Sequence, residues 1–284
     1  MRNFTLHKFL AMLLMAVSSA TLSVAQNVAK IGSTEYATLE EAVNSVVQGK
    51  KGYIFILADA SFDDLRIEGK QIIINLQNHT VTGNKIDVYG TDGTDTYLKI
   101  LDSKAKSPSV DTQNNYSVSY TTSGTLQLTK SITAYDGAKI TVESGTVVST
   151  TYFALLAYGD VTGQSDVASS IEVTGGYVRA QEGCVSPRGR GASVTVGPTK
   201  YSERKSMPVL ESLDNAAVMG NGTYEANKKW GGTSITISGK CWLIGRIQSQ
   251  GYAACGIYHP QQGSLSIKYY YGLLTLLPSM ALVS

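Results

Sequence analysis

The sequence predicts an all-β chain wound into a parallel β-helix, a solenoid of stacked strands, with one short α-helix before it. Short β-rich runs fill the chain from Tyr53 onward, glycine and small polar residues separate them, and related runs recur about every 30 residues. The chain has 28 glycines, 6 prolines and 16% charged residues. This composition is typical of a globular protein with many tight turns and excludes a disordered chain.

The first 25 residues have the layout of a secretory signal peptide. Two basic residues precede an apolar run, Phe9–Val17, and Ser23 and Ala25 then form a small-residue cleavage site before Gln26. The apolar run is well short of the ~20 residues that cross a bilayer as a helix, so we expect no membrane span after cleavage. The mature chain is therefore expected to be exported to the periplasm, the cell surface or the medium.

A short helix is predicted over residues 37–48. Thr38 and Glu41 form a T-x-x-E capping box ahead of apolar residues at helical spacing, and Gly49 follows the last of them. The first strands of a solenoid leave unpaired backbone groups at their edge. A helix laid across that edge would prevent edge-to-edge aggregation, so we expect this helix to cap the stack.

Nearly all of the remaining chain is expected to be β-strand. Alternating or continuous β-branched and aliphatic residues, bounded by Gly, Asn, Asp and Ser, predict strands at residues 53–57, 71–76, 96–101, 124–129, 138–143, 145–150, 169–174, 192–196 and 233–238.

The spacing of related runs predicts how these strands stack. Four of them begin at Ile140, Ile171, Ile235 and Leu265, at intervals of 31, 64 and 30 residues, and the interval of 64 is interpreted as two turns of about 32. Each turn holds about three short strands and no helix, so we expect a three-stranded coil in which these four residues face inward on one parallel sheet. The corners are expected at four glycines that tolerate positive φ: Gly145, Gly175, Gly176 and Gly239.

The segments 36–59 and 67–83 carry a resemblance to a known family. YATLEEAVNSVVQGKKGYIFILAD and IEGKQIIINLQNHTVTG resemble the opening helix, first two strands and turn of the pectin-lyase-like right-handed parallel β-helix superfamily, and also uncharacterised secreted or surface β-helix proteins of gut Bacteroidales. The resemblance implies one right-handed β-helix domain over residues 26–268. It implies little about activity, because this fold carries lyases, hydrolases, adhesins and structural stalks.

Residues 269–284 depart from the strand pattern and contain no charged residue. Three interpretations stay open for this atypical apolar segment: a last strand with an apolar cap, a contact surface for another chain, or a coding-frame disruption that removed further coils.

No catalytic constellation is evident. Asp63 and Asp64 lack the N-T-D and G-H-G partners of polygalacturonase-like hydrolases and are expected in a solvated turn. Asp92 and Asp95 are weak calcium candidates, because their loop lacks the closing Glu and the length of an EF-hand. His79 and His259 are expected in turns. We therefore expect no catalytic residue and no cofactor, with a polysaccharide lyase or hydrolase of the same fold as the alternative.

The three cysteines do not form a recognisable metal site. The spacings between Cys184, Cys241 and Cys255 fit no zinc site, and an oxidising compartment could pair two of the three at most. At least one of them is expected to be an ordinary core residue.

The charges are distributed unevenly. Residues 31–110 carry 8 Lys or Arg against 11 Asp or Glu, whereas residues 176–250 carry 10 against 5. Basic and aromatic residues in the second region could form one face that binds an anionic polysaccharide or cell-envelope glycan, or could be ordinary exposed loops. A net charge of only +2 argues against nucleic acid. The candidate binding residues are Arg188, Arg190, Tyr201, Arg204, Lys205, Lys228, Lys229 and Trp230.

These observations favour a secreted or cell-surface protein with a structural or adhesive role and affinity for glycans.

Overall fold

The structure is a computed structural model that describes residues 26–120, 123–159, 167–198, 207–220, 232–247, 252–254, 256–258 and 263–268. This described part is nearly all β, with parallel strands in stacked sheets and a single helix. None of its helices has the length and apolarity that crossing a membrane requires.

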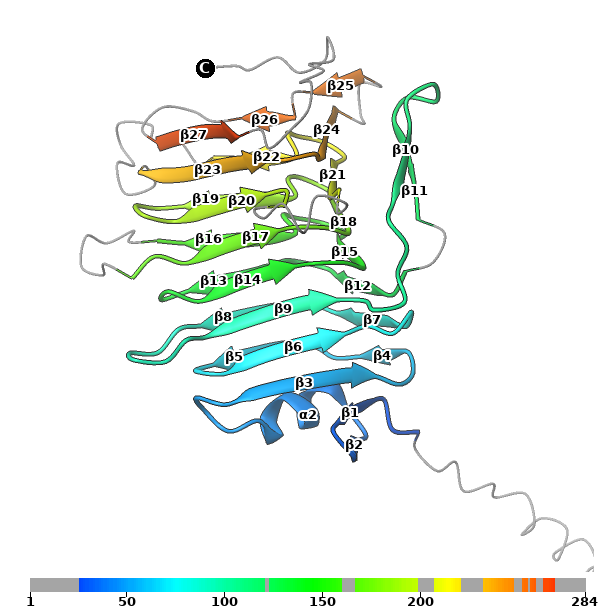
Figure 1. Cartoon of the computed structure of the whole chain (residues 1–284), viewed down its shortest axis with the longest axis vertical. Helices are drawn as coiled ribbons and strands as arrows, with labels where there is room; N and C mark the ends of the chain where they lie inside the picture. The colour runs from blue at the N-terminus through cyan, green and yellow to red at the C-terminus, as the bar shows by residue number, and fades with distance from the viewer. Residues whose placement is uncertain are drawn as a thin grey trace, which may run out of the picture.

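Most strands belong to three sheets (Figure 1). In order across each sheet, sheet A contains β2 (Thr34–Tyr36), β1 (Ala29–Ile31), β3 (Lys51–Ile56), β6 (Gln71–Asn75), β9 (Tyr97–Leu101), β14 (Lys139–Val142), β17 (Ser170–Val173), β20 (Ser193–Val196), β23 (Thr233–Ser238) and β27 (Gly263–Lys268). Sheet B contains β25 (Tyr252–Ala254), β24 (Trp242–Ile247), β21 (Val209–Ser212), β18 (Tyr177–Ala180), β15 (Thr146–Ser149), β12 (Thr125–Leu128), β7 (Thr80–Gly83) and β4 (Ala60–Ser61). Sheet C contains β26 (Ile257–Tyr258), β22 (Val218–Met219), β19 (Val185–Arg188), β16 (Leu155–Tyr158), β13 (Ile132–Tyr135), β8 (Lys85–Tyr89) and β5 (Asp64–Glu68).

The chain passes through sheets A, B and C in turn, and we call each pass a rung. The first rung is β3, β4 and β5, the third begins with β9, the fifth with β17 and the seventh with β23. From β3 onward, each strand of sheet A pairs in parallel with the strand of the next rung. Equivalent residues of successive rungs therefore lie about 4.8 Å apart.

The four repeat positions predicted from the sequence occupy one column of sheet A, as expected. Ile140 pairs with Ile171, and Val194 links Ile171 to Ile235, which pairs with Leu265. Ile140, Ile171 and Ile235 are buried, and Leu265 packs against the same core. All nine strands predicted from the β-rich runs are also present.

The rungs are not of one length, so the fixed period predicted from the sequence is wrong. Ile54 pairs with Ile74 and Ile100 pairs with Val142, so the first of these two rungs takes about half as much chain as the second. The paired strands stay short while the connections between them differ, because a connection outside the sheets does not alter the pairing within them.

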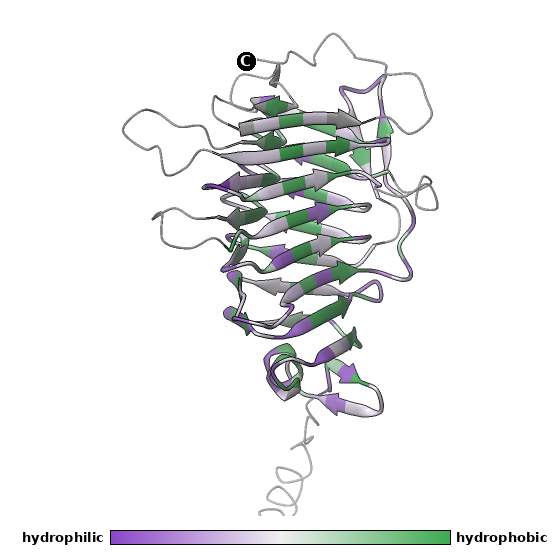
Figure 2. Ribbon diagram, turned by 60° about the vertical axis from the view of Figure 1, so that its left-hand side comes forward, coloured by the Kyte–Doolittle hydropathy of each residue, from purple (hydrophilic) through white to green (hydrophobic). Residues whose placement is uncertain are grey.

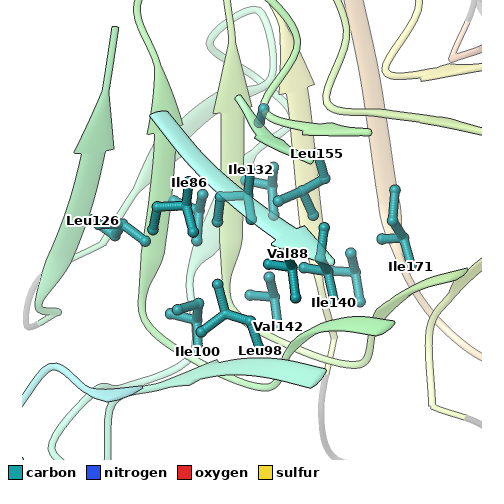
Figure 3. Packing of buried hydrophobic residues seen from close by; sticks show 14 of the residues in the cluster. Ile86, Val88, Leu98, Ile100, Leu126, Ile132, Ile140, Val142, Leu155 and Ile171 are labelled. Atoms are coloured by element: carbon teal, nitrogen blue, oxygen red, sulfur yellow. The ribbon is translucent and has the colours of Figure 1, made fainter. Parts of the chain in front are cut away.

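Inward residues of the three sheets form one continuous core (Figure 3). Leu98 and Val142 from sheet A, Leu126 from sheet B and Ile86 and Leu155 from sheet C are all buried in it. Hydrophobic residues alternate with polar ones along the strands, which places every second side chain inside (Figure 2).

The helix α2 (Leu39–Ser45) lies against β1, β2 and β3 at the start of the stack. Thr38 Oγ1 accepts a hydrogen bond from the Glu41 amide at 3.1 Å, and the Glu41 carboxylate accepts one from the Ala37 amide. Leu39, Ala42 and Val43 join the main core. α2 is shorter than the predicted range of 37–48, because the backbone is already extended at Val46.

Three of the four predicted corner glycines have positive φ. The values are 85° at Gly145, 77° at Gly176 and 62° at Gly239, whereas Gly175 does not belong to this group. Gly176 therefore holds the left-handed conformation of its corner, and the prediction for its neighbour was wrong.

A β-hairpin interrupts the third rung between β9 and β12. β10 (Ser109–Asp111) and β11 (Ser117–Ser119) pair antiparallel with each other in a separate two-stranded sheet. Figures 1 and 2 show this hairpin running along the stack, beside sheet B, rather than across it. It accounts for most of the extra length of its rung.

Candidate functional site

A column of aromatic and basic residues follows the outer face of sheet C. The parallel register aligns Tyr89 of β8, Tyr135 of β13, Tyr158 of β16 and Arg188 of β19 in four successive rungs. Their neighbours Val88, Ala134 and Ala157 are buried in the core. Because side chains alternate along a strand, the column faces outward.

The three tyrosine rings stack on one another. The ring centroids of Tyr89 and Tyr135 are 4.8 Å apart and those of Tyr135 and Tyr158 are 5.2 Å apart, with 13° between the planes in both pairs. The centroid spacing follows the distance between rungs, about 4.8 Å. Both faces of Tyr135 and one face of each outer ring meet a neighbouring ring, so the ring edges and phenol groups are the parts of the stack that are open to other molecules.

An arginine covers the first ring of the column. The Arg66 guanidinium carbon lies 3.8 Å from the Tyr89 ring centroid, and Arg66 also pairs with Glu68 at 2.9 Å. The hydrogen bond that it donates to Glu68 raises the pKa of Arg66 above its ordinary value. This guanidinium is therefore a permanent positive charge at the N-terminal end of the column.

Arg188 occupies the other end and contacts aromatic groups. It donates to the Tyr152 hydroxyl and, through Nη1, to the Tyr158 hydroxyl, each at 3.4 Å. Its guanidinium carbon lies 4.9 Å from the Phe153 ring centroid and 5.8 Å from that of Tyr152. Arg188 Nε is buried without a hydrogen bond, and Arg188 has no ion pair within the described ranges. Among the described residues, its charge is thus balanced by aromatic faces and not by a carboxylate.

The electrostatics of the column favour hydrogen bonding over proton transfer near neutral pH. Burial, followed by the nearby Asp87 charge, raises the pKa of Tyr135 to about 12. Asp87 itself accepts a hydrogen bond from Lys85 at 2.6 Å, and this contact raises the pKa of Lys85. The Tyr135 phenol therefore keeps its proton and acts as a hydrogen-bond donor or acceptor.

Only two of the eight candidate binding residues lie in the described part. Arg188 is the last residue of β19 and is half-buried, whereas Arg190 is exposed in the following turn between Gly189 and Gly191. Both glycines have positive φ, 88° and 82°, which lets the chain reverse there. Tyr201, Arg204, Lys205, Lys228, Lys229 and Trp230 lie outside the described residues.

The carboxylates considered in the sequence lie in exposed positions. Asp64 starts β5 and accepts a hydrogen bond from the Asn84 side chain at 2.6 Å, and Asp63 precedes it. Asp92 is exposed in a turn closed by the Thr91–Thr94 bridge, and Asp95 is exposed directly after that bridge. No group of three metal-binding side chains occurs among the described residues.

His79 and two cysteines are also placed. His79 Nδ1 lies 3.6 Å from the carboxylate of Asp59, a partner that adjacent sequence positions did not indicate. His259 and Cys255 lie outside the described residues. Cys184 is buried and Cys241 partly buried, and both are free thiols.

A second polar cluster, on sheet B, was not predicted from the sequence. The buried Glu211 carboxylate accepts hydrogen bonds from Arg246 Nε at 2.7 Å and from the Tyr177 hydroxyl, and Arg179 Nε lies 3.6 Å away. These residues come from β18, β21 and β24 in three successive rungs. Unequal rung lengths hide this alignment, so no regular spacing could have indicated it.

Comparison of the chain with protein-family models, with curated proteins and with solved structures finds no match in any of the three.

Proposed function

We propose that this chain is an exported, right-handed parallel β-helix of the pectin-lyase-like type, with α2 as its cap, that serves as a structural or adhesive element and binds acidic glycans. The parallel three-sheet rungs support this architecture, and parallel crossover connections in proteins are almost always right-handed. The resemblance of residues 36–59 and 67–83 to the opening of that superfamily supports it as well.

The observation that carries glycan binding is the tyrosine column of sheet C with a guanidinium at each end. Its three phenols are spaced by about one rung, so their hydroxyls form a regular row of hydrogen-bonding groups. A linear polysaccharide repeats its hydroxyl groups along its length. Such a chain could lie along the stack axis and meet one phenol after another, as tyrosines commonly do at polar binding surfaces.

The charge at the C-terminal end of the column favours an acidic glycan over a neutral one. Arg188 has no carboxylate partner in the described ranges, and Arg190 follows it in an exposed turn. A planar guanidinium binds carboxylate or sulfate groups through paired hydrogen bonds. The remaining basic and aromatic candidates, from Tyr201 to Trp230, are proposed to extend this surface.

Direct binding measurements test the proposal. The mature chain is titrated with polygalacturonate fragments, with their carboxyl-reduced neutral counterparts and with a sulfated glycan at low and physiological salt. We expect binding of the acidic glycans that weakens sharply as salt rises, because exposed charges are screened over about 8–10 Å. We also expect weakening by Arg188→Gln and Tyr135→Ala, whereas Lys51→Gln, at an exposed basic residue that starts β3 in sheet A, serves as the control.

Absence of any binding at low salt would reject glycan recognition at this face. The same samples are assayed for unsaturated products, with and without calcium, to test the alternative of a lyase. Product formation that is lost on changing Asp63, Asp64, Asp92 or Asp95 would replace the adhesive function by an enzymatic one.

A further inference from the structure

We infer that the β10–β11 hairpin is a releasable strap that couples the third rung to the seventh and is fastened at its tip by Arg246. The hairpin leaves the stack between two strands of the third rung, β9 and β12, and its tip lies against β24 of the seventh. Figure 1 shows it upright beside the stack over this length.

The fastening consists of two hydrogen bonds to the backbone of the hairpin tip. Arg246 Nη1 donates to the Asn115 carbonyl and Nη2 donates to the Tyr116 carbonyl, both at 3.0 Å. Asn115 and Tyr116 both adopt the left-handed conformation, with φ of 47° and 54°. Two consecutive residues in the same helical conformation point their carbonyls in similar directions. The guanidinium can therefore donate to both backbone carbonyls at once, and it contacts the backbone of the turn and not its side chains.

The buried Glu211 carboxylate orients the fastening arginine. Its carboxylate accepts a hydrogen bond from Arg246 Nε at 2.7 Å. The other two guanidinium nitrogens, Nη1 and Nη2, are thereby left to bind the hairpin. The side chain of Glu211 is only 10% exposed and that of Arg246 only 16%, so water screens this pair weakly. Arg246 is therefore held in the position that meets the hairpin tip.

Two aromatic contacts support the hairpin at separate heights. The Tyr120 ring lies 6.4 Å from that of Tyr177 in the fifth rung, and the Tyr116 ring lies 6.3 Å from that of Trp242 in the seventh. Val209, which lies between Tyr177 and Trp242 in the register of sheet B, is fully buried although it occupies an outward position. The hairpin thus follows the outer face of this sheet along several rungs.

The hairpin is built so that it can detach as a unit. β10 and β11 form a sheet of their own and share no ladder with the strands of the described stack. Among the described residues, the side chains of Arg246 and Trp242 hold the tip, so its release from them does not require breaking a sheet.

The strap changes how the stack opens. In a stacked-repeat protein each rung contacts its neighbours only, and cooperativity decays with distance along the stack. The bonds from Arg246 join residues 131 and 130 positions apart in the chain and link the third rung to the seventh. With the strap closed, the third to seventh rungs open together; with it released, the sixth and seventh open by themselves.

Hydrogen–deuterium exchange of the mature chain, followed by mass spectrometry, tests this inference. Arg246→Gln removes the fastening, and Arg179→Gln is the matched control because Arg179 also pairs with Glu211 but makes no hydrogen bond to the described hairpin. We expect Arg246→Gln to speed exchange in residues 109–119 and in β21 and β24 by about tenfold or more, because charged hydrogen bonds are lost. In Arg246→Gln, exchange in β3 and β6 should change much less. In Arg179→Gln, exchange should change much less throughout the chain, except at Glu211.

A second variant keeps the test decisive if Arg246→Gln fails to fold. Replacing residues 109–119 with a short Gly-Ser turn leaves Arg246 in place and should speed exchange in β21 and β24 to the same degree. Unchanged exchange of the hairpin in Arg246→Gln would show that it is not fastened there. Faster exchange of the hairpin with unchanged exchange in β21 and β24 would show that the hairpin does not couple the rungs. Equal effects of Arg179→Gln would show that the cause is the loss of a positive charge beside the buried Glu211, and not the loss of the fastening.

Discussion

Gly176 packs so closely against Gly145 of the preceding rung that a Cβ at Gly176 would lie 2.6 Å from the Gly145 carbonyl oxygen. That oxygen accepts the Tyr177 amide at 2.9 Å, so it cannot retreat without breaking the ladder of sheet B. Both glycines have positive φ, 77° at Gly176 and 85° at Gly145. The corner between sheets A and B is thus closed by two stacked glycines.

Gly176→Ala should destabilise the protein more than Gly93→Ala. Both positions have positive φ, but a Cβ at Gly93 would have nothing within 4 Å. The shared backbone strain costs about 1–2 kcal/mol, and the steric clash at Gly176 adds about 1–3 kcal/mol. Urea unfolding of the two variants measures the difference. Equal losses would show that the corner relaxes around the new methyl group.

The tyrosine column should contribute to stability as well as to binding. Tyr135→Ala removes stacking with Tyr89 and with Tyr158, and aromatic pairs contribute about 0.5–1.5 kcal/mol each beyond area burial. We expect the lost stacking alone to reduce the free energy of unfolding by about 1–3 kcal/mol, and the lost ring area to add to this. Tyr135→Phe keeps both stacks and loses the hydroxyl, so it should stay near the parent in stability yet weaken glycan binding. A Phe variant as unstable as the Ala variant would contradict the stacking account.

Cys184 should resist alkylation in the folded protein. Its side chain is fully buried, its thiol donates to the Val178 carbonyl at 3.3 Å, and burial raises its pKa well above the ordinary value. Because the thiolate is the reactive form, iodoacetamide near pH 8 should leave Cys184 unmodified until denaturant is added. Peptide mapping by mass spectrometry reads out the modification. Rapid labelling without denaturant would mean that this rung opens far more readily than its packing indicates.

The stacked core could be predicted from the sequence because inward residues repeat their own chemistry. Spacing alone identifies Ile140, Ile171 and Ile235 as equivalent positions. Each begins an alternation of aliphatic residues that ends at a glycine corner, and this pattern recurs because each strand of sheet A packs against the same core. Local patterns of this kind survive changes in loop length. The fixed period does not, because the hairpin and the longer connections lie outside the sheets.

The candidate sites depend on contacts that local patterns do not encode. Tyr89, Tyr135 and Tyr158 are unevenly spaced along the chain, so their stack appears only once the register of sheet C is known. The basic composition of residues 176–250 did indicate Arg188, but it did not indicate that Arg188 ends β19 and lies against aromatic rings. The link between Arg246 and Asn115 joins a side chain to a backbone carbonyl, for which a sequence carries no residue-type signal.

Stability should fall as pH rises from about 10 to 12, and Tyr135 should account for part of the decrease. Burial raises the pKa of Tyr135 to about 12, and burial together with the Glu211 charge raises that of Tyr177 further still. A tyrosine in the unfolded chain releases its proton near pH 10. Between these values the unfolded state binds fewer protons than the folded state, so the free energy of unfolding decreases with rising pH, whereas below about pH 9 both states are protonated and the slope from these groups vanishes.

Urea unfolding at pH 8, 9, 10 and 11 measures this dependence, with tyrosinate absorbance followed on the same samples. Each pKa unit corresponds to about 1.4 kcal/mol at full burial, and partial exposure of the ring reduces the contribution of Tyr135 to about 1–2 kcal/mol across the window. Tyr135→Phe removes the titrating group but keeps the stack, so its stability should fall less steeply above pH 10 and match the parent's slope below pH 9. An unchanged slope above pH 10 in Tyr135→Phe would show that this phenol is hydrated and that the column is more open to solvent than its stacking indicates.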